Sequence, residues 1–256
     1  MKTLKNTIAI LLLIFIASCS KDNEPTQEPV QEIRENRLLK EINDKTTKTF
    51  QYNNSGQLIK ITELGQVDAF GITQKITDYT YNSEGKISVK KVELAGSASA
   101  VFTYNYYYGL DGKLGYIAVR RKLGAASFQD FADLVYDFTT TNVIKETDTF
   151  NQKATIVNIL KGNVTGTSYY TNVTNINPNG ILNYTNLYSN YDNKKTSYDY
   201  FSLKILYNFP FTSKNNEGRY ESSGVDINYT YEYNSDGYPT KRTAGNVVTT
   251  FEYERL

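Results

Sequence analysis

Carboxylates are the side chains of this sequence with the most capacity for catalysis, because a pair of them can act as general acid and general base, as in glycoside hydrolysis. Six candidates lie in the middle of the chain: Glu93, Asp130, Asp133, Asp137, Glu146 and Asp148. They have no signature spacing, and solvated strand faces explain all six. The sequence has no histidine and one cysteine, which excludes Ser-His-Asp and Cys-His nucleophiles and histidine metal sites. We therefore predict no enzymatic activity.

Metal and nucleic-acid binding also lack a sequence pattern. Residues 82–85 and 234–237 are rich in oxygen-bearing side chains, but they lack the longer ligand spacing of a calcium loop, and plain turn chemistry explains them. The chain has 28 basic and 27 acidic residues, so no basic excess favours nucleic acid. We predict no metal, no cofactor and no nucleic-acid partner.

Aromatic side chains offer a binding surface instead. The sequence has 23 tyrosines and no tryptophan, and flat tyrosine rings can stack on a ligand and hydrogen-bond to it. One tyrosine-rich stretch with little periodicity could form a platform for a glycan or an extended peptide: Tyr184, Tyr188, Tyr191, Tyr198, Tyr200, Phe209 and Phe211. The alternative is that these rings cap the open ends of a sheet.

A repeated unit organises the chain around these residues. It reads aromatic-x-aromatic-Asn-x-x-Gly-x-apolar and occurs at 50–60, 79–89 and 229–238, with a looser copy at 106–114 that has Gly109 in place of the asparagine. Asparagine favours the first position of a type I turn, and glycine accepts the positive φ often required at the last. Each copy therefore predicts a hairpin. In the copy at 79–89, Ile87 and Val89 are expected on one face of the second strand, and Lys86, Ser88 and Lys90 on the opposite face.

The repeats predict an all-β fold with a single domain over 36–256, an antiparallel meander of repeated hairpins that is either a curled sheet or barrel-like. Residues 125–134 are interpreted as a turn of helix or the approach to a strand, and 165–176 have no strong core face. Residues 189–221 are interpreted as a long irregular excursion with a few strand residues. A final strand is expected at 246–253, and its edge, if unpaired, could recruit a partner by strand addition.

The N-terminus has the pattern of an export signal. A basic start and an apolar run too short to span a bilayer predict a signal peptide over 1–18. Ile16-Ala17-Ser18-Cys19 resembles the lipobox of bacterial lipoproteins, which implies that Cys19 is lipidated and anchors the chain to a membrane. Residues 19–35 then form a disordered tether. Its start, 20–24, resembles the acidic signal of surface-exposed lipoproteins in Bacteroidetes-type bacteria.

The repeat unit resembles the YD repeats of bacterial cell-surface proteins. Together with the lipobox, it makes the chain similar to a Bacteroidetes lipoprotein family, a domain of unknown function with a porin-like fold. This resemblance implies a sheet curling toward a barrel and no known activity. A membrane-spanning barrel would need a continuous apolar outer band about 25 Å tall. Polar strand faces such as Thr230 and Glu232, and a mean hydropathy of −0.50, favour a lipid-tethered soluble domain.

Two functions fit these observations. The first is a lipid-anchored outer-membrane lipoprotein, exposed at the cell surface or facing the periplasm, that binds a glycan or peptide without catalysis. The alternative is a structural or assembly component of the cell envelope.

Overall fold

The computed structural model describes residues 36–67, 71–96, 99–197 and 213–256, and all regular elements in these ranges are strands. The chain divides between residues 33 and 34, and the first part lies outside the described residues. The strands are β1 (Asn36–Ile42), β2 (Thr46–Tyr52), β3 (Leu58–Gly65), β4 (Ile72–Tyr81), β5 (Ile87–Gly96), β6 (Ala100–Tyr108), β7 (Leu114–Leu123), β8 (Gln129–Asp137), β9 (Val143–Asp148), β10 (Lys153–Leu160), β11 (Asn163–Thr171), β12 (Ile181–Ser189), β13 (Arg219–Ser222), β14 (Val225–Tyr233), β15 (Pro239–Ala244) and β16 (Val247–Arg255).

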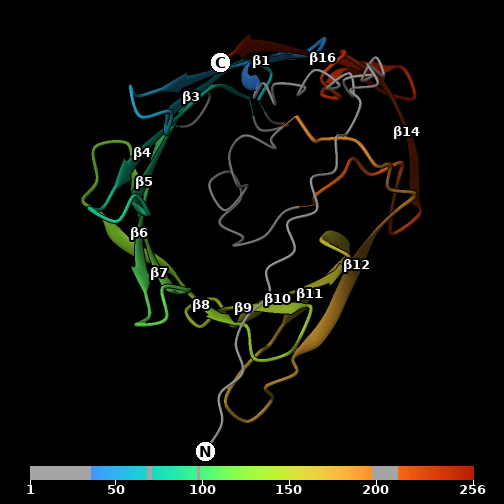
Figure 1. Ribbon diagram of the computed structural model, residues 1–256. Helices are drawn as coiled ribbons and strands as arrows, with labels where there is room; N and C mark the ends of the chain where they lie inside the picture. Colours follow the sequence, from blue (N-terminus) through green and yellow to red (C-terminus); the bar gives the residue numbers. More distant parts are fainter. Residues whose placement is uncertain (1–35, 68–70, 97–98, 198–212) are drawn as a thin grey trace, which may run out of the picture. The chain divides into compact units, whose positions relative to one another are not determined.

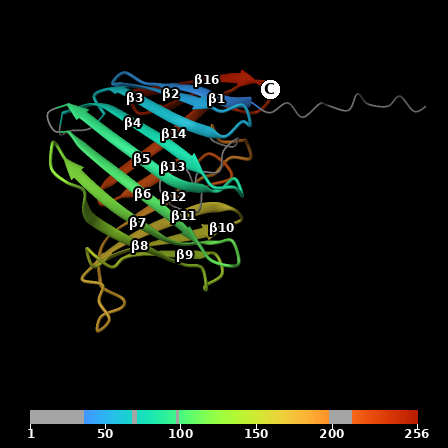
Figure 2. The ribbon, with the colours of Figure 1, turned by 90° about the vertical axis from the view of Figure 1, so that its left-hand side faces the viewer.

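The strands form one closed antiparallel barrel in chain order (Figure 1). Each strand pairs with the next, and β16 returns to pair with β1, with Asn36 opposite Arg255. Figure 2 shows the tilted strands side by side in alternating direction. The all-β meander is therefore confirmed, in its closed form. The idea of an unpaired final strand is wrong, because β16 has a partner on both sides.

The predicted turns form as expected. In the copy at 79–89, the Asn82 carboxamide oxygen accepts hydrogen bonds from the backbone N–H groups of Glu84 and Lys86, at 3.0 and 2.9 Å. The N–H of Gly85 donates to the Asn82 carbonyl, and Gly85 has a φ of 75°. The side chains of Asn53 and Asn234 make the same bonds. Because these turns all follow even-numbered strands, they lie on one rim of the barrel, which we call the turn rim.

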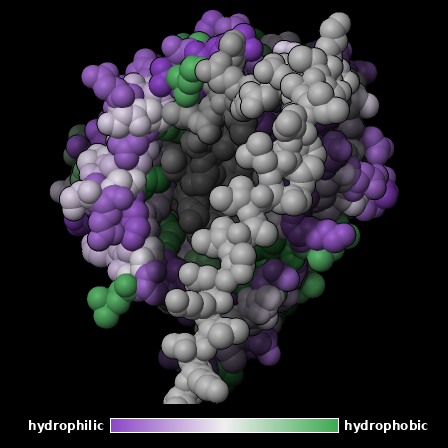
Figure 3. Space-filling view, viewed as in Figure 1, coloured by the Kyte–Doolittle hydropathy of each residue, from purple (hydrophilic) through white to green (hydrophobic). Residues whose placement is uncertain are grey.

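The two faces of the barrel wall differ in polarity. Buried apolar side chains on alternate strand positions form one interior cluster that runs from Leu38 to Phe251. The outward positions carry cross-strand ion pairs instead, including Lys40–Glu252 at 2.9 Å and Lys60–Asp78 at 3.3 Å. Figure 3 views one end of the barrel, where hydrophilic side chains predominate on the outer surface of the wall. The apolar core thus lies inside the barrel.

One predicted face assignment is wrong. Lys90 does not lie on the polar outer face: it is only 5% exposed and points inward, as Ile87 does. The cause is a register shift in the β4–β5 pair, where Thr80 faces Val89 but Tyr81 faces Ile87. The extra residue, Ser88, reverses the inside–outside alternation that follows it.

Three other stretches can be compared with their predicted secondary structure. Residues 129–137 form β8, so the stretch at 125–134 is the approach to a strand and not a helical turn. Residues 163–171 form β11, which includes much of the stretch at 165–176 that has no strong core face in the sequence. The irregular stretch contributes β13 at 219–222, while 198–212 lie outside the described residues.

Candidate functional site

A buried lysine lies on the interior wall of the barrel. Lys90 Nζ lies 4.0 Å from the centroid of the Tyr104 ring, which faces it across the β5–β6 pair. Burial lowers the pKa of Lys90 to about 7, and the nearby positive charge of Lys75 adds to this shift. The negative charge of Glu146 opposes it. The amine therefore changes its charge near neutral pH.

Glu146 is the acidic counterpart of this lysine. It lies on β9, and its carboxylate accepts a hydrogen bond of 2.5 Å from the Tyr136 hydroxyl on β8. Desolvation raises the pKa of Glu146 to about 6, although the hydrogen bond from Tyr136 opposes the rise. Burial also raises the pKa of Tyr136, so its hydroxyl stays protonated. The interior thus holds an acid, a base and phenols close to one another.

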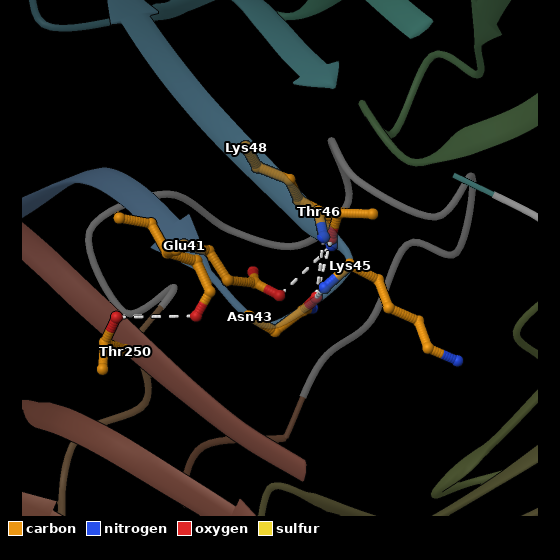
Figure 4. Close-up of polar contacts among 7 residues, drawn as sticks. Glu41, Asn43, Lys45, Thr46, Lys48 and Thr250 are labelled. Carbon is orange, nitrogen blue, oxygen red and sulfur yellow. Dashed lines mark hydrogen bonds and ion pairs between the residues drawn. The ribbon is translucent and has the colours of Figure 1, made fainter. Parts of the chain in front are cut away.

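A row of charges of alternating sign leads along the same wall. Glu41, Lys48, Glu63 and Lys75 are successive cross-strand partners from β1 to β4. The first pair is shown in Figure 4, with Lys48 Nζ 3.2 Å from Glu41 Oε1. The Asn43 carboxamide closes the turn beside this pair by accepting from the Lys45 and Thr46 N–H groups. Opposite charges facing one another in this way lower the cost of burying each.

The structure brings together part of the predicted tyrosine platform. Tyr184 lies on β12 and stacks on Tyr169 of β11, with ring centroids 4.5 Å apart. Further along β12, Tyr188 packs on Tyr220 of β13 at 5.4 Å. These rings share the face that Val157 buries in the core, since the register connects them across β10 to β13. Both predicted tyrosines of β12 therefore lie on the inner wall.

Tyr191, the remaining platform residue that the structure describes, does not extend this surface. The Tyr191 hydroxyl donates to the Val164 carbonyl and lies 3.1 Å from Ser213 Oγ, so it fastens its loop to the start of β11. Burial raises the pKa of this hydroxyl. Tyr198, Tyr200, Phe209 and Phe211 lie outside the described residues.

Asp192, which the sequence patterns do not single out, organises the same loop. Its carboxylate accepts hydrogen bonds from the Tyr233 hydroxyl and from the backbone N–H and the side chain of Asn216. Asn216 in turn donates to the Lys195 carbonyl at 2.9 Å, and Lys195 Nζ lies 3.2 Å from the Tyr238 hydroxyl. Residues 190–197 and 213–217 are thereby tied to β14 and to the last repeat turn. No local sequence pattern could have identified Asp192, because its partner Tyr233 lies in a distant repeat.

Most of the six candidate carboxylates form an ion pair or a hydrogen bond with a partner of their own. Glu93 pairs with Lys91 and Asp130 with Arg120. Three others hold local partners: Asp133 accepts from the Tyr116 hydroxyl, Asp137 from the Thr139 N–H and Asp148 from Asn151. The charge of Asp148 also contributes to the raised pKa of Glu146. The interpretation of Glu146 as a solvated surface residue is wrong, because it faces the interior.

A cavity lies on the outer side of the wall. It has a volume of about 580 Å³ between β9, the β9–β10 turn and the loop that follows β11, and its lining comprises Lys145, Thr147, Thr149, Gln152, Val173, Thr174, Asn175 and Pro178. Lys145 Nζ bonds the Pro178 carbonyl at 3.2 Å and joins the loop to β9. Most of the lining side chains are hydroxyls or amides. We call this space the outer cavity.

Metal clusters and membrane-spanning helices are both missing from the described part of the chain. The residues that the structure describes contain no group of three or more His, Cys, Asp or Glu side chains placed to hold a metal ion. No helix in those same ranges is long and apolar enough to cross a bilayer.

Comparisons with known proteins find similarity in structure alone. No protein-family model and no curated protein matches the sequence. Among solved structures, the chain is similar to a porin-like protein from Bacteroides uniformis, with a TM-score of 0.35 and 13% sequence identity over 85% of this chain and 96% of that chain. The barrel is assigned from the strand register of this chain alone. The resemblance to a lipoprotein family stays a prediction.

Proposed function

We propose that this chain is a lipid-anchored protein of the outer membrane whose barrel stands in water and binds a ligand without catalysis. The observation that carries the proposal is the charged outer face. Cationic side chains on a lipid-facing barrel wall cost about 2–4 kcal/mol each at the bilayer midplane. The outward ion pairs Lys40–Glu252, Lys60–Asp78 and Lys241–Glu232 suit water instead.

The anchor in this proposal is the lipid on Cys19, with the tether 19–35 joining it to β1. The tether limits the distance between the anchor and the barrel to about 3.3–3.6 Å for each tether residue, the length of a fully extended chain. β1 begins at the turn rim, whereas the β9–β10 turn and the loop around the outer cavity lie at the other rim.

Fatty-acid labelling and membrane fractionation test the lipid anchor and the water-exposed barrel. The native chain should incorporate a labelled fatty acid, and a Cys19→Ser variant should not. When a cleavable, non-lipoprotein signal peptide is placed directly before Ser20, the exported chain should be soluble without detergent. A chain of this kind that stays in the membrane after alkaline extraction would show that the barrel itself spans the bilayer, and would overturn the proposal.

The binding role rests on rings and hydroxyls that reach solvent on the outer face, such as Tyr107 of β6, which is 54% exposed. The alternative is a structural or assembly component of the cell envelope. Closure of the barrel leaves the described strands no free edge, so this component would not recruit a partner by strand addition. Protease treatment of intact cells distinguishes the two orientations: cleavage places the barrel at the cell surface, and protection places it in the periplasm. In either compartment the ligand-binding role stands.

A further inference from the structure

A row of exposed and half-buried side chains crosses the outer face of four strands. Tyr107 of β6, Tyr116 of β7, Val135 of β8 and Thr147 of β9 are successive cross-strand partners. Partners share a face, and neighbouring strands lie about 4.8 Å apart, so the row is about 14 Å long. Tyr107 is 54% exposed and Val135 is 41% exposed. We call these four residues the outer track.

The aromatic end of the outer track is held in a defined orientation. The rings of Tyr107 and Tyr116 lie 5.4 Å apart with their planes inclined by 36°. The hydroxyl of Tyr116 donates to the Asp133 carboxylate at 2.5 Å, which restricts the rotation of that ring. Rigid tyrosine rings give contact area at low cost in conformational entropy. Two such rings in a row suit a ligand made of successive flat units.

The other end of the outer track opens into the outer cavity, because Thr147 is part of the cavity lining. Its volume of about 580 Å³ lies within the roughly 300–1,000 Å³ of sites that hold small molecules. Hydrogen-bonding groups converge there from Thr147, Thr149, Gln152 and Asn175. No hydrogen bond joins any of these four side chains to another described residue. A ligand with several hydroxyl groups would use them.

The loop over the cavity is fixed before any ligand arrives. The Val173 N–H donates to the Gln152 carbonyl at 3.0 Å, and Lys145 reaches the Pro178 carbonyl. At the end of the loop, Gly180 has a φ of 63°, and a Cβ atom there would lie 2.6 Å from the Thr171 carbonyl oxygen. The cavity is therefore preformed, which lowers the entropic cost of binding.

We propose that the outer track and the outer cavity together bind one extended, uncharged oligosaccharide, with sugar rings on Tyr107 and Tyr116 and sugar hydroxyls in the cavity. This inference rests on the binding role proposed above and names its ligand class. Among the described residues of the lining, Lys145 is the one that carries a charge, and it faces Asp137 in the β8–β9 register. An acidic ligand is therefore not favoured. A peptide strand lacks a free sheet edge to extend, because the barrel is closed.

Glycan arrays followed by calorimetry test this proposal on the purified full-length chain in detergent. Neutral oligosaccharides should bind, and the corresponding monosaccharides should bind at least tenfold more weakly, because they cannot span the row. Tyr107→Ala should weaken binding at least tenfold, and Thr147→Trp should abolish it by filling the cavity. The matched controls are Tyr184→Ala on the inner wall and Thr230→Trp on the outer face of β14, both with unchanged affinity. Equal melting temperatures of Thr147→Trp and Thr230→Trp show that both fold.

Three results would overturn the inference. No neutral glycan binds the folded chain; peptides alone bind on a parallel peptide array; or Tyr184→Ala removes glycan binding while Tyr107→Ala leaves it intact, which moves the ligand to the inner wall. The fractionation experiment reports on the anchored, water-exposed barrel separately. A failure of the ligand class is thus distinguished from a failure of that part of the proposed function.

Discussion

The hydroxyl of Tyr81 donates a hydrogen bond of 2.6 Å to the carbonyl oxygen of Leu58. Tyr81 is the last residue of β4 before its turn, and Leu58 is the first residue of β3 after the preceding turn. The next repeat makes the same link, from Tyr108 to Ile87 at 2.8 Å. In these two copies the aromatic residue before the turn thus fastens its repeat to the one before it, whereas Tyr233, before the last repeat turn, donates to Asp192. The hydrogen bond explains why this position carries tyrosine. Phenylalanine would fill an apolar strand face equally well but has no hydroxyl to donate.

Replacing Tyr81 with phenylalanine should therefore destabilise the barrel. The substitution leaves the Leu58 carbonyl without its side-chain partner, and an unsatisfied buried acceptor costs about 1–3 kcal/mol. Tyr107→Phe is the control, because Tyr107 points outward and no hydrogen bond joins its hydroxyl to another described residue. Urea unfolding of the two variants measures the difference. Equal midpoints for the two variants would show that the link contributes nothing.

The turn glycines should be sensitive for reasons of backbone conformation alone. Gly85 has a φ of 75°, and a Cβ atom added there would meet nothing closer than the Gln57 amide nitrogen at 3.5 Å. Gly85→Ala should cost about 1–2 kcal/mol, the penalty of left-handed backbone for an L-residue. Gly115 in β7 lies outside the positive-φ region and has room for a Cβ atom. Gly115→Ala should be neutral or stabilising in the same unfolding assay, and a loss comparable to that of Gly85→Ala would contradict this account.

The turns were predictable because their chemistry is local. Asn82 and Gly85 lie within one turn and form its bonds alone, so the printed sequence is enough. The looser copy also forms its turn: there Asp111 accepts from the Lys113 N–H, in place of the missing asparagine. Local patterns therefore predicted most strands and their antiparallel order.

Barrel closure and the interior site were not predictable in this way. The pairing of Asn36 with Arg255 joins opposite ends of the domain and leaves no local trace. The burial of Lys90 depends on one extra residue, Ser88, in the β4–β5 ladder, which reverses every later position of the strand. β11 was missed because tyrosines occupy both of its faces, at 169 and 170, so it shows no alternation.

Buried Lys90 predicts a pH dependence of stability. Its pKa is about 7 in the barrel, against an ordinary value of 10.5 for an unperturbed lysine. Between these values the unfolded chain binds one more proton than the folded chain, so stability should rise with pH by up to about 1.4 kcal/mol per unit. Lys90→Met should lack this rise. Lys91→Met, which removes an outward lysine of the same strand, should keep it. Unfolding free energies measured from pH 7 to pH 10 decide between these outcomes.

Glu146 should have the opposite effect at lower pH. Its pKa is about 6 in the barrel, against an ordinary value of 4.5 for an unperturbed glutamate. The folded chain therefore binds more protons in that window, and stability should fall as pH rises through it. Glu146→Gln should reduce the fall, to which Glu217 also contributes because burial raises its pKa, while leaving an amide to accept from Tyr136. If native and Glu146→Gln chains have parallel stability profiles between pH 4.5 and pH 6, the carboxylate is not desolvated as described.

Closure of the barrel makes β16 essential and its position in the chain dispensable. Deleting residues 247–256 should expose two long unpaired edges, on β1 and β15, and such edges promote aggregation. Moving β16 ahead of β1 should restore the fold, because the two strands are antiparallel partners and Arg255 lies opposite Asn36. A short Asn-Gly linker would then make them an ordinary hairpin. Size-exclusion chromatography and thermal melting should show a monomer with near-native stability for the rearranged chain and aggregates for the deletion. A monomeric deletion variant with native melting would mean that the β1–β16 pairing does not hold the barrel closed.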